Sequence, residues 1–267
     1  MIRRLSAVWP AANGARPRPL EAGSVRVLAV SDEIEPALEY EKNRKALMPL
    51  DAIIGAGDLT PEYLDFLADA FRVPLLYVRG NHDRGGGWHE EISHVPEPMD
   101  GTWHNVAGLT VAGLSWPSDK HERAIHDDNA AWRQVAARYL RLRSPRPDII
   151  VSHVPPLGLG DTPEDHYHRG FAAYRWLCER LKPVLWVHGH TALAAADHWW
   201  VAHGPTTLVN VTGAVLLELA PRGAENGSGE NGSGEKLIAE KAAAGVSGAT
   251  IDEGPPQLAH EGVSEAR

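Results

Sequence analysis

The sequence predicts an α/β fold in which helices cover layers of β-strands, and three observations favour it. The chain has 267 residues, of which 43% are hydrophobic and 23% charged, as in ordinary globular proteins. Short apolar or β-branched runs alternate with segments of helical periodicity. Clusters of Asp, Asn and His follow five of these runs. A chain of this length fits one α/β domain of catalytic size with less regular ends.

Eight apolar runs are predicted to form strands. They are 25–30, 51–54, 74–78, 109–114, 148–151, 184–187, 206–211 and 215–219. Thr212, Gly213 and Ala214 separate the last two runs, and their turn chemistry predicts a hairpin there.

Three helices are predicted from capping residues and from apolar spacing. Thr60 is a candidate N-cap ahead of Pro61, and Asp128 is a candidate N-cap for a second helix. A third helix presents one apolar face made by Phe171, Tyr174, Cys178 and Leu181. Cys178 is therefore most simply a core residue.

The two ends of the chain differ in composition from the rest. We expect residues 1–23 to be a flexible lead-in, because they lack periodicity, and residues 24–220 to form the domain. Residues 221–267 are rich in Gly, Ser and Glu and repeat Glu-Asn-Gly-Ser-Gly at 225–229 and 230–234. Such a composition buries too little apolar surface to order itself, so this tail is expected to be disordered.

Charge and cysteine content exclude several classes of protein. The formal net charge of −9 argues against a protein that wraps a nucleic-acid polymer. The single cysteine excludes internal disulfides and zinc clusters with two or more thiolates from one chain. No run of about 18 apolar residues or signal-peptide core is seen, so we expect a cytoplasmic protein without a membrane partner.

Residues able to bind a metal ion follow five of the predicted strands. The clusters are Ser31-Asp32, Gly57-Asp58, Gly80-Asn81-His82-Asp83, Ser152-His153 and His188-Gly189-His190. Ligand sites of open α/β sheets assemble at the carboxyl ends of strands. A mixture of carboxylate, amide oxygen and imidazole suits Mn, Fe or Zn better than Cu(I) or Ca. The sequence therefore predicts a site for one or two divalent ions.

These motifs resemble those of the calcineurin-like metallophosphoesterase superfamily over residues 25–219. The resemblance implies an α/β fold with a two-layer β-sandwich flanked by helices, and hydrolysis of a phosphoester by metal-activated water. It implies that Asp58 bridges two ions and that Asn81, His153 and His190 complete one site. His82 is similar to the family histidine that stabilises the transition state or protonates the leaving group.

The sequence departs from the family pattern at two positions of the other metal site. Ile34 and Ala192 stand where the family has histidines, which leaves only Asp32 and the shared Asp58. We therefore expect one well-formed site and a second that is degenerate or rebuilt. Candidate replacement ligands are Glu33, His188, His203, Asn210 and the Asp197-His198 pair.

Basic residues near the clusters are candidates for holding a small phosphorylated substrate. Arg84 follows the Gly-Asn-His-Asp element, and His168 and Arg169 precede a predicted helix. Asp83 either orients His82 or closes its turn.

A metal-dependent phosphoesterase is the leading functional hypothesis, and two alternatives stay open. One is a non-catalytic, metal-containing protein that binds a phosphorylated ligand, which the losses at Ile34 and Ala192 favour. The other is a metal enzyme of a different reaction type on the same scaffold. The residues do not identify the substrate.

Overall fold

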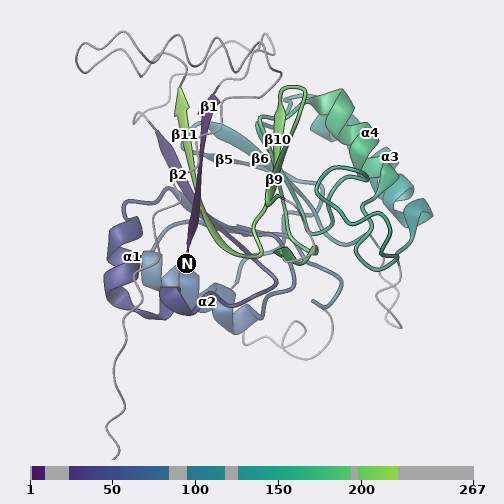
Figure 1. The fold of residues 1–267 in the computed structure, drawn as a ribbon. Helices are drawn as coiled ribbons and strands as arrows, with labels where there is room; N and C mark the ends of the chain where they lie inside the picture. The colour runs from purple at the N-terminus through teal and green to yellow at the C-terminus, as the bar shows by residue number, and fades with distance from the viewer. Residues whose placement is uncertain (1, 10–23, 84–94, 118–125, 194–197, 222–267) are drawn as a thin grey trace, which may run out of the picture.

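Two β-sheets packed face to face, with helices on both outer sides, form the fold (Figure 1). The structure is a computed structural model, and it describes residues 2–9, 24–83, 95–117, 126–193 and 198–221. This arrangement confirms the expected α/β sandwich flanked by helices. Among the described residues, no helix combines the length and the apolar character needed to cross a membrane.

The first sheet has the strand order β1-β11-β2-β3-β4. Its strands are β1 (Arg3–Trp9), β2 (Val25–Ser31), β3 (Ala52–Gly55), β4 (Leu75–Tyr77) and β11 (Gly213–Pro221). Strands β2, β3 and β4 run parallel, whereas β11 is antiparallel to β2. The 3-10 helix η1 (Pro36–Glu39) and the helices α1 (Glu41–Leu47) and α2 (Pro61–Phe71) contribute buried side chains to its outer face.

The second sheet has the strand order β5-β6-β7-β8-β10-β9. Its strands are β5 (Trp103–Val106), β6 (Leu109–Leu114), β7 (Ile149–Ser152), β8 (Leu185–His188), β9 (Trp200–His203) and β10 (Thr206–Asn210). The four inner strands are parallel, and the two edge strands are antiparallel to their neighbours. Helices α3 (Asp128–Leu142) and α4 (Ala172–Leu181) pack on its outer face.

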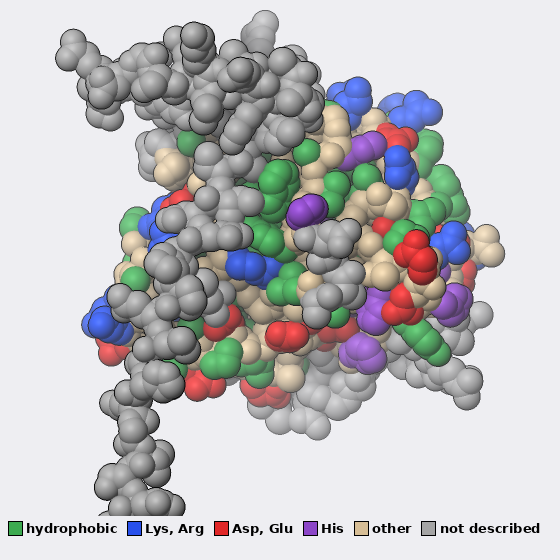
Figure 2. All heavy atoms as spheres, viewed as in Figure 1, with side chains coloured by type: hydrophobic (Ala, Val, Ile, Leu, Met, Phe, Trp, Pro, Cys, Tyr) green, Lys and Arg blue, Asp and Glu red, His purple; other side chains and the backbone are tan. Residues whose placement is uncertain are grey.

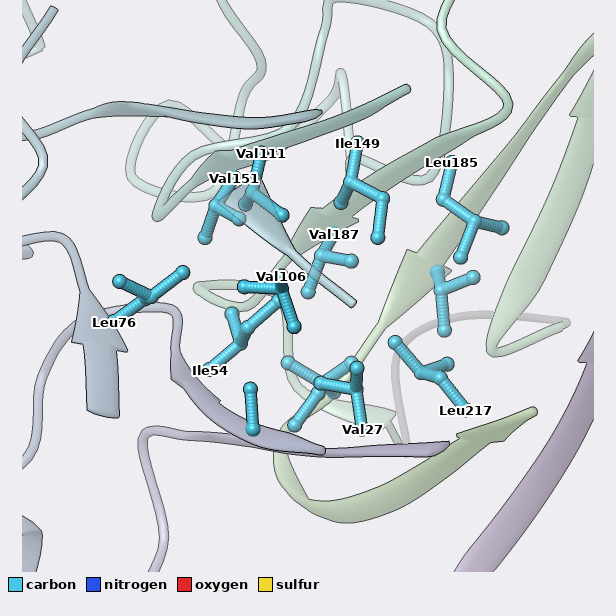
Figure 3. Close-up of a cluster of buried hydrophobic side chains, with 14 of the residues drawn as sticks. Val27, Ile54, Leu76, Val106, Val111, Ile149, Val151, Leu185, Val187 and Leu217 are labelled. Carbon is cyan, nitrogen blue, oxygen red and sulfur yellow. The ribbon is translucent and has the colours of Figure 1, made fainter. Parts of the chain in front are cut away.

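Aliphatic side chains from both sheets fill the space between them (Figure 3). Those nearly inaccessible to solvent include Val27, Ile54, Leu217, Val111, Val151 and Val187. Burying such side chains contributes about 1.5–3 kcal/mol each, which holds the two sheets together. The carboxyl ends of parallel strands from both sheets meet at one edge, where Asp32, Asp58 and His153 come together.

The N-cap of α2 is the residue predicted from the sequence, and the N-cap of α3 lies one residue earlier than predicted. Thr60 Oγ1 accepts the N–H of Tyr63 at 3.3 Å, and Pro61 is the first residue of α2. The N-cap of α3 is Asp127 rather than Asp128, because Asp127 Oδ1 accepts the N–H of Ala130 at 3.0 Å.

Part of the expected lead-in belongs to the fold. Arg3–Trp9 forms β1 and pairs in parallel with β11, so the domain does not start at residue 24. Leu5, which is 1% exposed, anchors this strand in the core between the sheets. Residues 10–23 and 222–267 lie outside the described residues.

The hairpin expected around Gly213 is wrong. Strand β10 pairs with β8 and β9, whereas β11 pairs with β1 and β2 in the other sheet. The chain therefore crosses between sheets here. Gly213 has a φ of +76°, which glycine adopts at little cost.

Candidate metal centre

Side chains from both sheets converge where the parallel strands end. Asp32 directly follows β2, and Asp58 follows β3 after a short loop. His153 directly follows β7 of the second sheet. Each of these residues offers one ligand atom, and the three atoms lie within 4.8 Å of one another. The sandwich thus brings together donors that are far apart in the sequence.

His153 links the second sheet to two carboxylates of the first sheet. Its Nε2 lies 3.1 Å from Asp58 Oδ2 and 4.0 Å from Asp32 Oδ1. Its Nδ1 is 2.9 Å from the carbonyl oxygen of Ala56. A carbonyl only accepts, so Nδ1 carries the hydrogen and Nε2 faces the carboxylates.

His190 has the complementary arrangement. Its Nε2 lies 2.7 Å from the carbonyl oxygen of Tyr167, so Nε2 carries a hydrogen there. Its Nδ1 faces His153 Nε2 at 3.2 Å. In neutral rings, these two facing nitrogens would both present lone pairs. A proton or a metal ion is therefore needed between the two nitrogens. Each ring is oriented by a backbone carbonyl on its other nitrogen, as is common for metal-binding histidines.

The charges and burial of these side chains favour a cation between them. Burial opposes protonation of His153, but the carboxylates of Asp58 and Asp32 and its hydrogen bonds raise the pKa to about 9. Burial and the nearby charge of His153 lower the pKa of His190 to about 3. Burial also opposes ionisation of Asp58, yet His153 and His82 lower its pKa overall. A metal ion would replace the proton on His153.

Asn81 adds an acceptor to the same edge. Its side chain is 8% exposed, and within the described ranges its Oδ1 has no hydrogen-bond partner. Buried polar atoms are nearly always paired, so this oxygen fits a ligand of a divalent ion. The chemistry of Asp58, Asn81, His153 and His190 together suits a transition metal.

Backbone conformation marks the same residues. Asp32, Asp58 and His190 have φ values of +60°, +55° and +67°. Left-handed conformations of residues other than glycine cost of order 1–3 kcal/mol and gather at functional sites. Here they turn side chains at strand ends toward the shared edge.

Asp83 closes the turn of the Gly-Asn-His-Asp element. Its Oδ2 accepts the N–H of Asp58 at 2.8 Å and the N–H of Gly80 at 2.7 Å. Burial raises its pKa to about 6, although the two N–H groups act in the opposite sense. Of the two roles left open by the sequence, the observed contacts correspond to turn closure.

His82 is exposed and contacts Asp58 through its backbone. Its backbone N–H donates to Asp58 Oδ1 at 2.8 Å, and its ring lies near enough to lower the pKa of Asp58. The backbone of His82 therefore holds one proposed ligand, and its side chain is exposed.

Of the three residues expected to bind the phosphate, His168 lies beside a proposed metal ligand. The His168 ring is 5.4 Å from the His190 ring, between centroids. Arg169 is exposed, and Arg84 lies outside the described residues. Histidine and acidic side chains also gather together on the face drawn in Figure 2.

Comparisons with known proteins identify the family of this chain. A family model described as calcineurin-like phosphoesterase matches residues 29–193, which include all the proposed metal ligands. The chain belongs to this family. No curated protein matches the sequence significantly.

The comparison with solved structures found similar chains at low sequence identity. One crystal structure has 16% identity and a TM-score of 0.51, covering 71% of this chain and 91% of its own. TT1561 of Thermus thermophilus has 18% identity and a TM-score of 0.49, with 71% and 89% covered. GAP50, the anchor in the inner membrane complex of Plasmodium, has 14% identity and a TM-score of 0.44, with 72% of each chain covered.

The carboxylate of Asp32 is occupied by protein donors. Its Oδ2 accepts from Ser31 Oγ at 2.5 Å and from Thr212 Oγ1 at 3.3 Å. The N–H of His190 lies 3.0 Å from the same oxygen. Asp32 therefore also ties the loop after β8 to the end of β2.

The positions where the family has histidines carry no donor here. Ile34 is 51% exposed and Ala192 is exposed. Among the replacements considered, His188 packs against Gly160, and His203 lies 3.6 Å from Glu179.

Of the remaining replacement candidates, Asn210 already has hydrogen-bond partners within the protein. The Asn210 side chain donates to the Thr191 carbonyl and accepts from the Thr212 N–H. Glu33 and His198 are exposed, and Asp197 lies outside the described residues.

Sequence reasoning missed one backbone partner of His190 and one arginine side chain near the site. The Tyr167 carbonyl has no residue-type signal, because any residue could supply it. Arg3, which donates to the carbonyls of Asn210 and Thr212, belongs to the missed strand β1. The alternation of Leu5 and Ala7 with polar residues could have indicated that strand.

Replacing Gly189 with alanine is expected to displace His190 and weaken metal binding while every donor remains. An added Cβ would overlap Ser31 Oγ and Asp32 Oδ2. Such overpacking costs about 1–3 kcal/mol. Thermal unfolding and metal titration calorimetry measure both effects.

Gly204→Ala is the matched control for this prediction. Nothing lies within 4 Å of a Cβ at Gly204, although its φ of +58° strains alanine. This control should lose some stability and keep its metal affinity. Equal metal affinities in the two variants would contradict the prediction for Gly189.

Proposed function

We propose that this protein hydrolyses a small phosphorylated substrate with the help of one divalent ion, Mn, Fe or Zn. Asp58, Asn81, His153 and His190 would hold the ion. The observation that supports this most strongly is the 3.2 Å approach of His153 Nε2 to His190 Nδ1. Both rings already direct their other nitrogen to a backbone carbonyl, so the facing nitrogens are available for a cation.

A bound divalent ion would lower the pKa of a coordinated water to about 7 and neutralise charge on phosphate oxygens. The protein supplies the remaining functions. His82 protonates the leaving oxygen as a general acid, since its ring is exposed beside Asp58. Arg84, His168 and Arg169 bind the phosphate.

We propose a second metal site that is degenerate, as the family pattern suggests. Asp32 keeps the carboxylate, but its oxygens already accept hydrogen bonds from Ser31, Thr212 and His190. Two carboxylates without imidazoles hold a transition metal weakly.

A cytoplasmic location is part of the same proposal and is supported by the single, buried cysteine.

A non-catalytic role is the second candidate. Ile34 and Ala192 favour it, because they remove two donors of the other metal site. In that case the remaining ion holds a phosphorylated ligand that the protein does not cleave. Binding without turnover across a panel of phosphate mono- and diesters would favour this role.

Metal stoichiometry and turnover of the full chain test the proposal. After loading with excess Mn, Fe or Zn and removal of loose ions, we expect one tightly held ion per chain. We also expect metal-dependent release of alcohol from a phosphoester panel. Two tightly held ions would contradict the degenerate site, whereas no bound ion and no turnover would contradict the hydrolase itself.

A further inference from the structure

We propose that Asp165 is a positioning residue for the metal ligand His190. It holds the turn at 162–168 so that the Tyr167 carbonyl receives the Nε2–H of His190. The inference rests on the metal role proposed above for His190 and adds a residue that lies outside the ligand set.

Asp165 organises this turn through both carboxylate oxygens. Its Oδ1 accepts the N–H of Tyr167 at 2.9 Å, and its Oδ2 lies 2.5 Å from His168 Nδ1. The backbone closes the same turn, because Thr162 N–H donates to the His168 carbonyl and Asp165 N–H donates to the Thr162 carbonyl. A side chain that accepts from the residue two positions later is a common way to fix such a turn.

The turn places the carbonyl oxygen of Tyr167 beside the proposed ligand His190. The Tyr167 carbonyl lies 2.7 Å from His190 Nε2 and so fixes which nitrogen carries the hydrogen. His190 Nδ1 is then left as the acceptor that faces His153. On its other side, His190 is held by its own N–H to Asp32. The ring orientation therefore depends on supports from two separate loops.

Loss of the Asp165 side chain should free the tip of this loop and leave its base intact. The base is held by hydrogen bonds between Leu157 and Phe171 and between Phe171 and Pro155. Asp161 Oδ2 also accepts the N–H of Gly170 at 2.8 Å. Asp165 is partly exposed and takes no part in these bonds, so its variants are expected to fold.

Three variants distinguish the effect of the Asp165–Tyr167 hydrogen bond from that of the Asp165–His168 ion pair. Asp165→Ala removes the acceptor for Tyr167, whereas Asp165→Asn keeps an oxygen that can accept from it. His168→Ala removes the ion pair and leaves the Asp165–Tyr167 bond. We expect Asp165→Ala to weaken Zn or Mn binding about 10- to 100-fold in titration calorimetry, as supports of metal-bound histidines do. Asp165→Asn and His168→Ala should stay near the parent affinity.

The imidazole tautomer of His190 is a readout that needs neither metal nor activity. Nitrogen-15 NMR of the metal-free full chain should show the Nε2–H form in the parent protein and a mixture of tautomers in Asp165→Ala. Unchanged tautomer and affinity in Asp165→Ala would overturn the inference. Equal weakening by His168→Ala would also overturn it, because the ion pair would then be the support. A parent chain that binds no metal contradicts the proposed function, and the tautomer experiment still decides the role of Asp165.

Discussion

Asp58→Asn is expected to abolish tight binding of a divalent ion and, with it, phosphoester hydrolysis. The carboxylate lies 3.1 Å from His153 Nε2, and a neutral amide removes its charge from the site. We expect metal affinity to fall by more than about 100-fold, since even residues that only support a ligand typically contribute 10- to 100-fold. Elemental analysis and titration calorimetry on the loaded chain measure this change.

The backbone at Asp58 makes asparagine the appropriate substitution. Its φ of +55° is left-handed, a conformation that asparagine tolerates better than most residues. The substituted side chain also keeps an oxygen that can accept from the N–H of His82. The variant should therefore fold, as circular dichroism can verify.

Asp51→Asn is the matched control for this experiment. Asp51 precedes strand β3 at the end opposite Asp58, and its Oδ2 accepts the N–H of Arg26 at 2.7 Å. The control should keep its bound ion and its activity. Full metal content and activity in Asp58→Asn would contradict both the site and the proposed hydrolase.

His82→Ala is expected to keep the metal ion and to lower kcat by about 10²- to 10⁴-fold, the usual contribution of a general acid. The exposed ring of His82 lies near Asp58, whereas it is the backbone N–H that donates to Asp58 Oδ1. Alanine retains that backbone donor. The substitution therefore removes the imidazole without disturbing the carboxylate.

Steady-state kinetics over a range of pH, together with metal content, test the role of His82. A general acid should contribute a limb of the pH–rate profile that disappears in the variant. His104→Ala is a matched control, because His104 is an exposed histidine on the edge strand β5. A kcat that His82→Ala leaves unchanged would exclude the acid role.

The sequence predicted most of the sheet framework and missed elements with weak patterns. All eight predicted strands correspond to observed strands within a few residues. Strands β5 and β9 were missed because their residues are largely exposed or half-buried, so no apolar run marks them. Local turn chemistry around Gly213 predicted a hairpin, but it could not indicate to which sheet the next strand belongs.

The sequence by itself determined the donor types and their positions at strand ends. These are local properties, because strand periodicity and residue type can be recognised within short segments of sequence. On that basis Asp32, Asp58, Asn81, His153 and His190 could be nominated together. The ligand atoms of Asp32, Asp58 and His153 lie within 4.8 Å of one another, and the full set of five stays a prediction.

Only the tertiary structure decided which atoms face one another. His153 bonds to the Ala56 carbonyl across 97 positions, and His190 bonds to Asp32 across 158. The same is true of the Tyr167 carbonyl on His190 and of Asp83 closing its turn. Every residue except proline carries the same backbone donor and acceptor, so these contacts depend on how the two sheets pack rather than on any local pattern.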